Sequence, residues 1–259
     1  GDDLIEGGGD SDVYRIGRGD GRDIIHDFED NSFRNDQDML QFLDGIRIGD
    51  LNFQREGASN DLVIKFKGDD ANQVTLQGQF SATYTGAFGV WYMEKIDLFT
   101  FDDGTSLTGD QVAKMVLKAY STDGNDQLYG FDSEDILSAG KGDDFISGGN
   151  QTDIYLYSRG DGNDSIQDGM TNILSGMDDY LRFGKGIGWS DLSFGRIDGD
   201  NNSVIIYING DQSGSITLSN QYAYASSMVF GDIFFDRIEE IQFADGSPTV
   251  DSYQLGAAG

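Results

Sequence analysis

The chain has 259 residues, and its 46 Asp and Glu against 17 Lys and Arg give a formal net charge of −29. This charge excludes electrostatic binding to nucleic acid or to an anionic membrane surface, because both partners are also negative. The absence of cysteine excludes disulfides and thiolate zinc sites, and a single histidine, His26, leaves almost nothing for a Ser-His-Asp triad.

The acidic residues are strongly skewed, with 39 Asp and 7 Glu beside 37 Gly and one Pro. Aspartate in this amount, together with glycine, is typical of tight turns or of oxygen ligands for a hard cation. A hydrophobic content of 37% is enough to bury a core. No apolar run approaches the roughly 18 residues of a membrane span. The sequence opens inside a Gly-Asp pattern, so we expect a segment of a longer protein.

The chain contains an internal duplication, because sequence motifs of its first half recur in the same order in its second half. For example, GDDLIEGGGDSDVY at 1–14 aligns with GDDFISGGNQTDIY at 142–155. The duplication predicts two tandem units, 1–120 and 121–259. We expect unit 1 to contain a partial roll (1–42), a strand-rich module (43–107) and a helix (109–119). We expect unit 2 to contain a longer roll (121–183) and a second strand-rich module (184–259).

The helix is predicted from a capping box and an apolar stripe. Thr108 with Gln111 three residues later forms the capping box. The expected buried stripe follows at helical spacing: Val112, Met115, Val116 and Ala119. Because it lies where the two units join, we interpret this helix as a connector or lid. Pro248 near the equivalent place makes a second helix doubtful.

A strict nine-residue period runs from 124 to 155, with Asp126, Asp135, Asp144 and Asp153 each nine apart. An apolar residue follows each of these aspartates by two positions. This spacing predicts a flattened coil in which a short strand turns its apolar residue inward and a glycine-rich turn reverses the chain. Two nonamers make one full turn, so each aspartate stacks on the next but one along the same edge. Stacked carboxylates repel unless a cation lies between them, and carboxylates with turn carbonyls supply the oxygens that Ca2+ accepts.

Residues 139–146 (AGKGDDFI) match the pattern G-G-x-G-x-D-x-U-x best, and 148–153 and 7–12 lack only the third glycine. The chain therefore resembles the RTX nonapeptide family. The strand-rich remainder, with RGDGND at 159–164 and IQFADG at 241–246, resembles the haemolysin-type calcium-binding related module. The resemblance implies an all-β fold of calcium-binding parallel β-roll segments, each followed by a strand-rich module.

The resemblance also implies several Ca2+ ions, each held between two stacked turns on one edge. The expected same-edge pairs are Asp126–Asp144, Asp135–Asp153, Asp144–Asp164, Asp3–Asp23, Asp153–Asp179 and Asp12–Asp38. The turn residues expected at the metal are Gly140, Gly142, Gly149 and Gln151. The alternative for any of these acids is a turn residue that hydrogen-bonds its own backbone.

We expect a non-enzymatic, calcium-binding folding module of a large bacterial toxin or adhesin. The resemblance implies export by a type I secretion apparatus and folding outside the cell or at its surface. One alternative is a carbohydrate-binding adhesin domain that meets a polysaccharide or host-cell surface through the aromatic loops 81–93 and 223–235. Another is the accessory C-terminal part of a secreted enzyme such as a lipase or epimerase. Two Arg-Gly-Asp triplets, 18–20 and 159–161, lie inside turn motifs and are not interpreted as adhesion signals.

Overall fold

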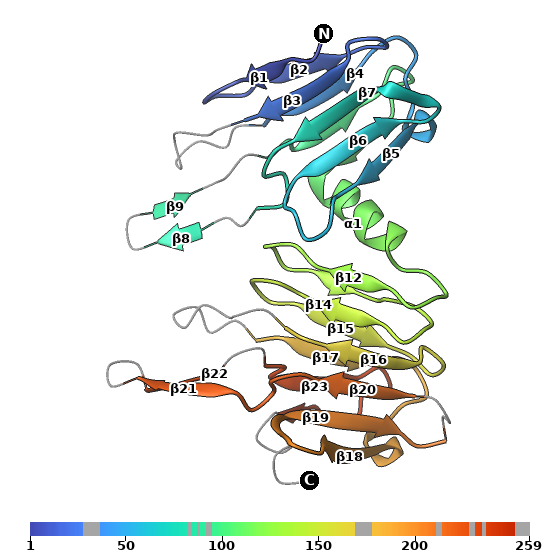
Figure 1. Cartoon of the computed structure of the whole chain (residues 1–259), viewed down its shortest axis with the longest axis vertical. Helices are drawn as coiled ribbons and strands as arrows, with labels where there is room; N and C mark the ends of the chain where they lie inside the picture. Colours follow the sequence, from blue (N-terminus) through green and yellow to red (C-terminus); the bar gives the residue numbers. More distant parts are fainter. Residues whose placement is uncertain are drawn as a thin grey trace. The chain divides into compact units, whose positions relative to one another are not determined.

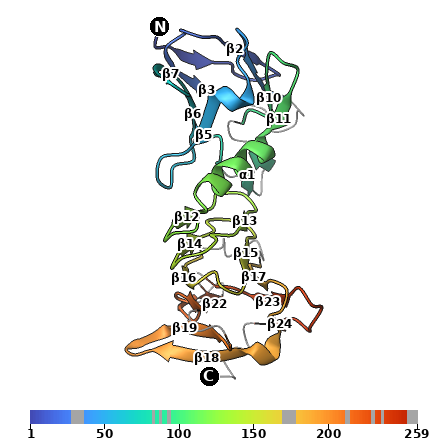
Figure 2. The same cartoon turned by 90° about the vertical axis from the view of Figure 1, so that its right-hand side faces the viewer.

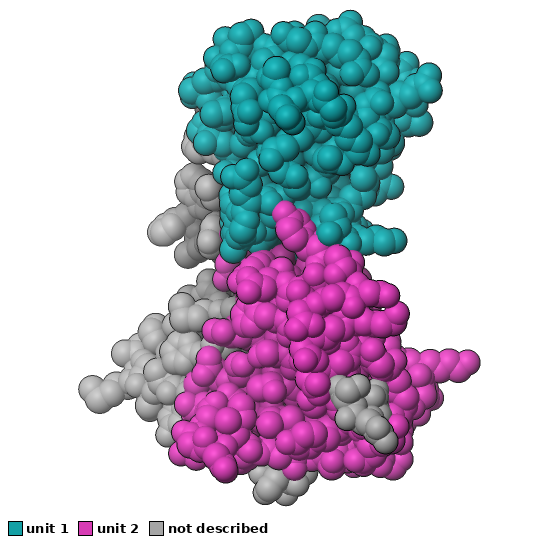
Figure 3. All heavy atoms as spheres, turned by 45° about the vertical axis from the view of Figure 1, so that its right-hand side comes forward, with its two compact units in different colours: residues 1–119 teal, residues 120–259 magenta. Residues whose placement is uncertain are grey.

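The computed structural model describes residues 1–27, 37–81, 84–86, 89–91, 95–168, 178–210, 214–227, 231–234 and 237–251. For the two short hairpins β8–β9 and β21–β22 it describes the backbone alone. The chain divides into two compact units, residues 1–119 and 120–259, which Figure 3 colours separately.

Unit 1 is built from short strands followed by one α-helix (Figure 1). Its elements are β1 (Leu4–Glu6), β2 (Val13–Ile16), β3 (Arg22–His26), β4 (Met39–Phe42), a 3-10 turn (Ile48–Asp50), β5 (Leu51–Gln54), β6 (Leu62–Phe66), β7 (Asp69–Leu76), β8 (Tyr84–Gly86), β9 (Gly89–Trp91), β10 (Leu98–Thr100), β11 (Ser106–Thr108) and α1 (Gly109–Ala119). One sheet has the order β1-β3-β7-β6-β5 and the facing sheet the order β11-β10-β4-β2. The strands β1, β3 and β7 are parallel, as are β2, β4 and β10.

Unit 2 repeats this plan with more turns. Its elements are β12 (Gln127–Tyr129), β13 (Ile136–Leu137), β14 (Phe145–Ser147), β15 (Ile154–Tyr157), β16 (Asn163–Ile166), β17 (Tyr180–Phe183), a 3-10 turn (Trp189–Asp191), β18 (Leu192–Ile197), β19 (Asp200–Ile208), β20 (Ser215–Leu218), β21 (Tyr224–Ser227), β22 (Gly231–Phe234), β23 (Glu240–Phe243) and β24 (Val250–Asp251). The sheets have the orders β12-β14-β16-β20-β19-β18 and β13-β15-β17-β23-β24. Consecutive strands from β12 to β17 therefore alternate between two parallel sheets, which Figure 2 shows edge on. This is the predicted parallel β-roll.

The register of the roll follows from its apolar columns. Each predicted apolar residue pairs with the one a full coil turn later, as Leu128 does with Ile146 and Leu137 with Tyr155. Both columns are buried between the sheets. Burial of a large apolar side chain contributes about 1.5–3 kcal/mol. A slip of one residue would turn the whole column outward, so the columns hold the turns in register.

The strand-rich segments continue the same two sheets in each unit. In unit 1, β7 pairs with β3 and β10 with β4, both in parallel. In unit 2, β20 pairs with β16 and β23 with β17 in the same way. Stacked phenylalanines close the interior at equivalent places, Phe42 with Phe101 and Phe183 with Phe243, with ring centroids 5.3 and 5.7 Å apart.

Helix α1 begins with the predicted capping box. The N–H of Thr108 donates to Oε1 of Gln111 (2.8 Å), and the N–H of Gln111 donates to Oγ1 of Thr108 (3.3 Å). The predicted buried stripe was partly wrong, because Met115 and Ala119 are exposed and Leu117 is buried with Val112 and Val116. The helix packs on β5 and β11 of unit 1, and this contact rotates its buried face toward Leu117.

The tightest packing between turns occurs at Gly162, which gives a prediction. A Cβ on Gly162 (φ +121°) would overlap the carbonyl oxygen of Gly142, whereas a Cβ on Gly160 (φ +87°) would meet nothing within 4 Å. Gly160→Ala should cost about 1–3 kcal/mol of backbone strain. Gly162→Ala should cost clearly more, because the clash is with backbone. Urea unfolding of both variants in saturating calcium measures the difference, and equal losses would contradict this account of the turn packing.

Candidate metal centre

One edge of unit 2 carries a column of three aspartates from successive coil turns. The N–H of Asp126 donates to Oδ1 of Asp144 (2.8 Å), and the N–H of Asp144 donates to Oδ1 of Asp164 (3.1 Å). Each carboxylate thus binds the backbone of the aspartate one coil turn earlier. The first carboxylate of the column, Asp126, accepts hydrogen bonds from the N–H (2.6 Å) and the hydroxyl (2.8 Å) of Thr122.

The opposite edge of unit 2 carries a longer column. The N–H of Asp135 donates to Oδ1 of Asp153 (2.8 Å), and the N–H of Asp153 donates to Oδ1 of Asp179 (2.7 Å). The N–H of Asp179 in turn donates to Oε2 of Glu239 (2.8 Å), the residue directly before β23. Both columns therefore repeat one contact between turns, from a backbone N–H to the next carboxylate.

Unit 1 repeats the same contact on a shorter roll. The N–H of Asp3 donates to Oδ1 of Asp23 (3.1 Å), and that of Asp12 donates to Oδ1 of Asp38 (2.8 Å). The N–H of Asp38 donates to Oδ2 of Asp97 (3.0 Å).

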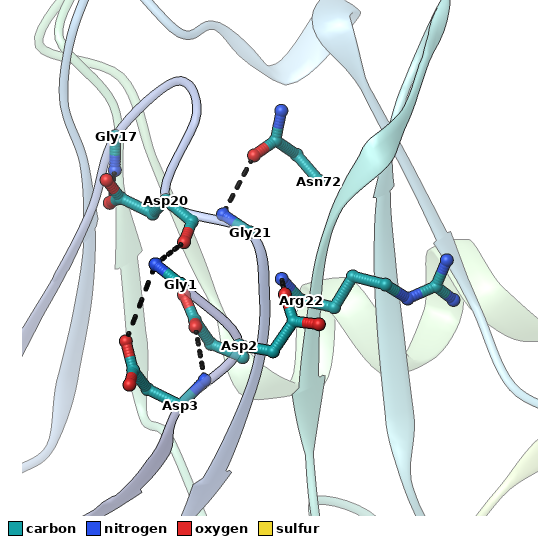
Figure 4. A network of polar contacts seen from close by, with 9 residues as sticks. Gly1, Asp2, Asp3, Gly17, Asp20, Gly21, Arg22 and Asn72 are labelled. Carbon is teal, nitrogen blue, oxygen red and sulfur yellow. Dashed lines mark hydrogen bonds and ion pairs between the residues drawn. The ribbon is translucent and has the colours of Figure 1, made fainter.

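The turn between β2 and β3 is also tied to a strand of the module, as Figure 4 shows from close by. The N–H of Gly21 donates to Oδ1 of Asn72 (3.0 Å) on β7. The N–H of Arg22 donates to Oδ1 of Asp2 (2.9 Å). Side-chain oxygens thus satisfy the backbone N–H groups of this turn, both from the preceding turn and from the following strand.

The structure brings together both members of each of the six same-edge pairs predicted from the sequence. Three of the predicted turn residues are glycines that lie close to the backbone of the preceding coil turn. A Cβ on Gly140, Gly142 or Gly149 would lie within 2.5 Å of a carbonyl oxygen of the preceding coil turn. Where the third glycine is missing, Gln151 and Asp10 take its left-handed conformation, at φ +72° and +75°. The role of these residues as calcium ligands stays a prediction.

The stacked carboxylates of Asp144, Asp153, Asp164 and Asp179 are buried. The Oδ2 atoms of Asp144, Asp153 and Asp179 are buried and accept no hydrogen bond. Burial, with the neighbouring carboxylates, raises the pKa of Asp153 to about 9 and the pKa of Asp164 to about 7. Oxygens that lack a donor and repel one another are the surroundings a hard cation favours, and these residues therefore fit Ca2+.

Two carboxylates that end the columns, Asp97 and Glu239, were missed in the sequence. They lie at the same place in the two units, directly after Lys95-Ile96 and Arg237-Ile238. The internal duplication is the sequence signal that could have identified both carboxylates, because it aligns them with each other. Because one copy has Asp and the other Glu, and neither lies in a glycine-rich turn, the nine-residue pattern does not reach them.

A buried glutamine in each unit positions these last carboxylates. The side chain of Gln79 binds both the C=O (3.0 Å) and the N–H (2.9 Å) of Ile96. Gln221 makes the same two hydrogen bonds to Ile238, at 2.7 and 3.1 Å. Each isoleucine directly precedes the terminal carboxylate of its column. The glutamines therefore fix the backbone that carries Asp97 and Glu239.

The two Arg-Gly-Asp triplets have a local structural role. Asp20 accepts a hydrogen bond from the N–H of Gly17 (2.6 Å), and Asp161 accepts one from the N–H of Ser158 (2.7 Å). Each aspartate thereby closes its own turn.

The aromatic loops weighed for sugar binding lie almost wholly outside the described side chains. Tyr222, directly before the second of these loops, packs its ring beneath the guanidinium of Arg196, whose Cζ lies 5.0 Å from the ring centroid. In the described part of the chain, no helix has both the length and the apolar character needed to cross a bilayer.

Comparison with known proteins agrees with this geometry. The family model described as RTX calcium-binding nonapeptide repeat (4 copies) matches residues 120–155 and 129–166, and that described as haemolysin-type calcium binding protein related domain matches 61–111. The chain is 38% identical over 131 residues to the Iron-regulated protein FrpA of Neisseria meningitidis serogroup C. This match covers 51% of the chain and 11% of that relative.

A solved structure, the extracellular lipase LipA from Serratia marcescens, is similar over 88% of this chain and 37% of its own, with 14% identity and a TM-score of 0.27. A TM-score this low does not establish a common overall fold. The family matches confirm the resemblance predicted from the sequence, and calcium is the ion that such repeats bind. Residues 120–166 therefore match the RTX calcium-binding nonapeptide repeat, and residues 61–111 match the haemolysin-type calcium binding protein related domain.

Proposed function

We propose that this chain is a calcium-dependent folding module of a large secreted bacterial protein of the toxin or adhesin type. On this proposal it has no catalytic role of its own. The proposal is carried by the buried carboxylates of Asp144, Asp153 and Asp179, in each of which one oxygen binds the neighbouring turn and the other is left without a donor.

The charge of the chain supports coupling between calcium binding and folding. Without a cation, folding brings like charges together in a chain whose net charge is already −29. Each bound Ca2+ neutralises two of these charges. Because the stacked sites form only when the turns stack, the free energy of binding becomes free energy of folding.

This coupling is well suited to export by a type I secretion apparatus, in which an unfolded chain passes the envelope and folds where calcium is plentiful. Both family matches are to calcium-binding families, which supports the proposal. A protein similar to this chain, Iron-regulated protein FrpA, is much longer than the matched segment. These similarities support our proposal that the module lies at the cell surface or outside the cell, as part of a longer chain.

The affinity for calcium tests this proposal. We expect the calcium midpoint for folding at about 0.1–1 mM, the range of extracellular calcium modules. The midpoint is measured by a calcium titration that is followed by tryptophan fluorescence. Trp189 reports on folding because its ring packs against that of Phe194, with ring centroids 5.4 Å apart. A midpoint in the range of cytosolic sensors, about 10⁻⁷–10⁻⁵ M, would contradict export of an unfolded chain, because the chain would fold before it left the cell.

A further inference from the structure

Unit 2 contains a group of three carboxylates at the end of its roll, formed by Asp153, Asp168 and Asp179. One carboxylate oxygen of each lies within 4.8 Å of those of the other two. All three side chains are buried, at 0%, 3% and 0% exposed. Since Ca2+–oxygen distances are about 2.3–2.6 Å, two oxygens on one ion are at most about 5 Å apart, so a single ion reaches all three.

Each of these carboxylates has one oxygen held and one oxygen free of hydrogen bonds. Oδ1 of Asp153 accepts the N–H of Asp135 (2.8 Å), and Oδ1 of Asp179 accepts the N–H of Asp153 (2.7 Å). Oδ1 of Asp168 accepts the hydroxyl of Tyr155. The three Oδ2 atoms are buried and accept no hydrogen bond. Ionising a single buried carboxyl group without a partner is already costly, and here three such groups lie together.

Tyr155 orients Asp168 and is itself held. The N–H of Gly148 donates to the Tyr155 hydroxyl (2.7 Å), which leaves the hydroxyl proton for Asp168. Such an outer partner commonly orients a carboxylate that binds a metal.

The same group occurs in unit 1, where Asp12, Asp27 and Asp38 also place carboxylate oxygens within 4.8 Å of one another. The duplication aligns these three with Asp153, Asp168 and Asp179 in that order, and it aligns Tyr14 with Tyr155. Asp27 and Asp168 occupy no aspartate position of the nonapeptide pattern, and both lie outside the segments matched by the family models.

We propose that Asp153, Asp168 and Asp179 form a buried three-carboxylate site for one Ca2+, and that Asp12, Asp27 and Asp38 form its copy in unit 1. This site differs from the turn sites because Asp168 adds a third carboxylate, oriented by a tyrosine. The inference rests on the proposed function, since it requires a chain that folds with calcium. The rival explanation is a proton shared between Asp168 and Asp179, whose pKa values are both raised by burial.

Asp168→Asn in the full chain separates these explanations. An amide donor replaces a shared proton, so under the rival explanation the variant binds as many ions as the wild type at each Ca2+ concentration. Under our proposal, one Ca2+ per chain binds more weakly to the variant than to the wild type, measured by equilibrium dialysis and elemental analysis at a series of Ca2+ concentrations. Asp198→Asn is the matched control, because it removes the same charge from an exposed hairpin turn of unit 2. An unchanged binding curve for Asp168→Asn would overturn the proposal.

A second variant keeps the test decisive if Asp168→Asn does not fold. Tyr155→Phe keeps all three carboxylates and removes the phenol beside the ion. With Tb3+ in place of Ca2+, we expect Tyr155→Phe to lose more tyrosine-sensitised emission than Tyr207→Phe, an exposed control. Equal emission from the two variants would contradict an ion beside Tyr155. If the wild type binds no calcium, the proposed function fails; if it binds and folds but neither variant differs from its control, only this inference fails.

Discussion

Asp144→Ala is expected to raise the calcium concentration at half-folding of unit 2 by at least about tenfold, and clearly more than Asp126→Ala does. Asp144 lies in the middle of its column, between Asp126 and Asp164. Its Oδ1 binds the turn before it, its N–H binds the carboxylate after it, and its Oδ2 is buried without a donor. An ion on either side of Asp144 can use its carboxylate, so the substitution weakens two sites.

Asp126 is the matched control because it is the first carboxylate of the column and has a stacked carboxylate, Asp144, on one side only. Its carboxylate already accepts hydrogen bonds from Thr122, so it can contribute to one site at most in this column. Tryptophan fluorescence in a Trp91→Phe background follows unit 2 alone through Trp189, since the chain has two tryptophans. Equal midpoints for the two variants would mean that Asp144 is not shared, and the stacked-turn account would be wrong.

Much of the roll could be predicted because its nine-residue period is visible in the sequence. Asp144 and Asp153 are separated by one nonamer, and the side-chain period of two then fixes which residues point inward, such as Ile146 and Tyr155. These two rules suffice to pair carboxylates that are one coil turn apart. They also allow for the insertions before Asp164 and Asp179, because the register of the apolar column is maintained across them.

The remainder depends on contacts between segments far apart in the sequence. Asp97 and Glu239 end their columns because β10 and β23 continue the parallel sheets. No local sequence period predicts the pairing of β10 with β4 or of β23 with β17. Asp168 follows its strand at the position where Gly148 stands one coil turn earlier, so it resembles an ordinary turn residue until Tyr155 is placed against it. The buried face of α1 likewise depends on the strands that it packs against, not on the helical period alone.

The carboxylate columns are expected to stack only when calcium lies between the turns. Far-ultraviolet circular dichroism of the full chain in EGTA and after addition of millimolar Ca2+ tests this expectation most directly, with Mg2+ as the control. We expect a largely disordered spectrum in EGTA that becomes β-rich with Ca2+. Mg2+ should substitute poorly, because it dehydrates reluctantly and demands tighter octahedral geometry. A β-rich spectrum in EGTA that melts cooperatively and does not change on adding Ca2+ would contradict the account.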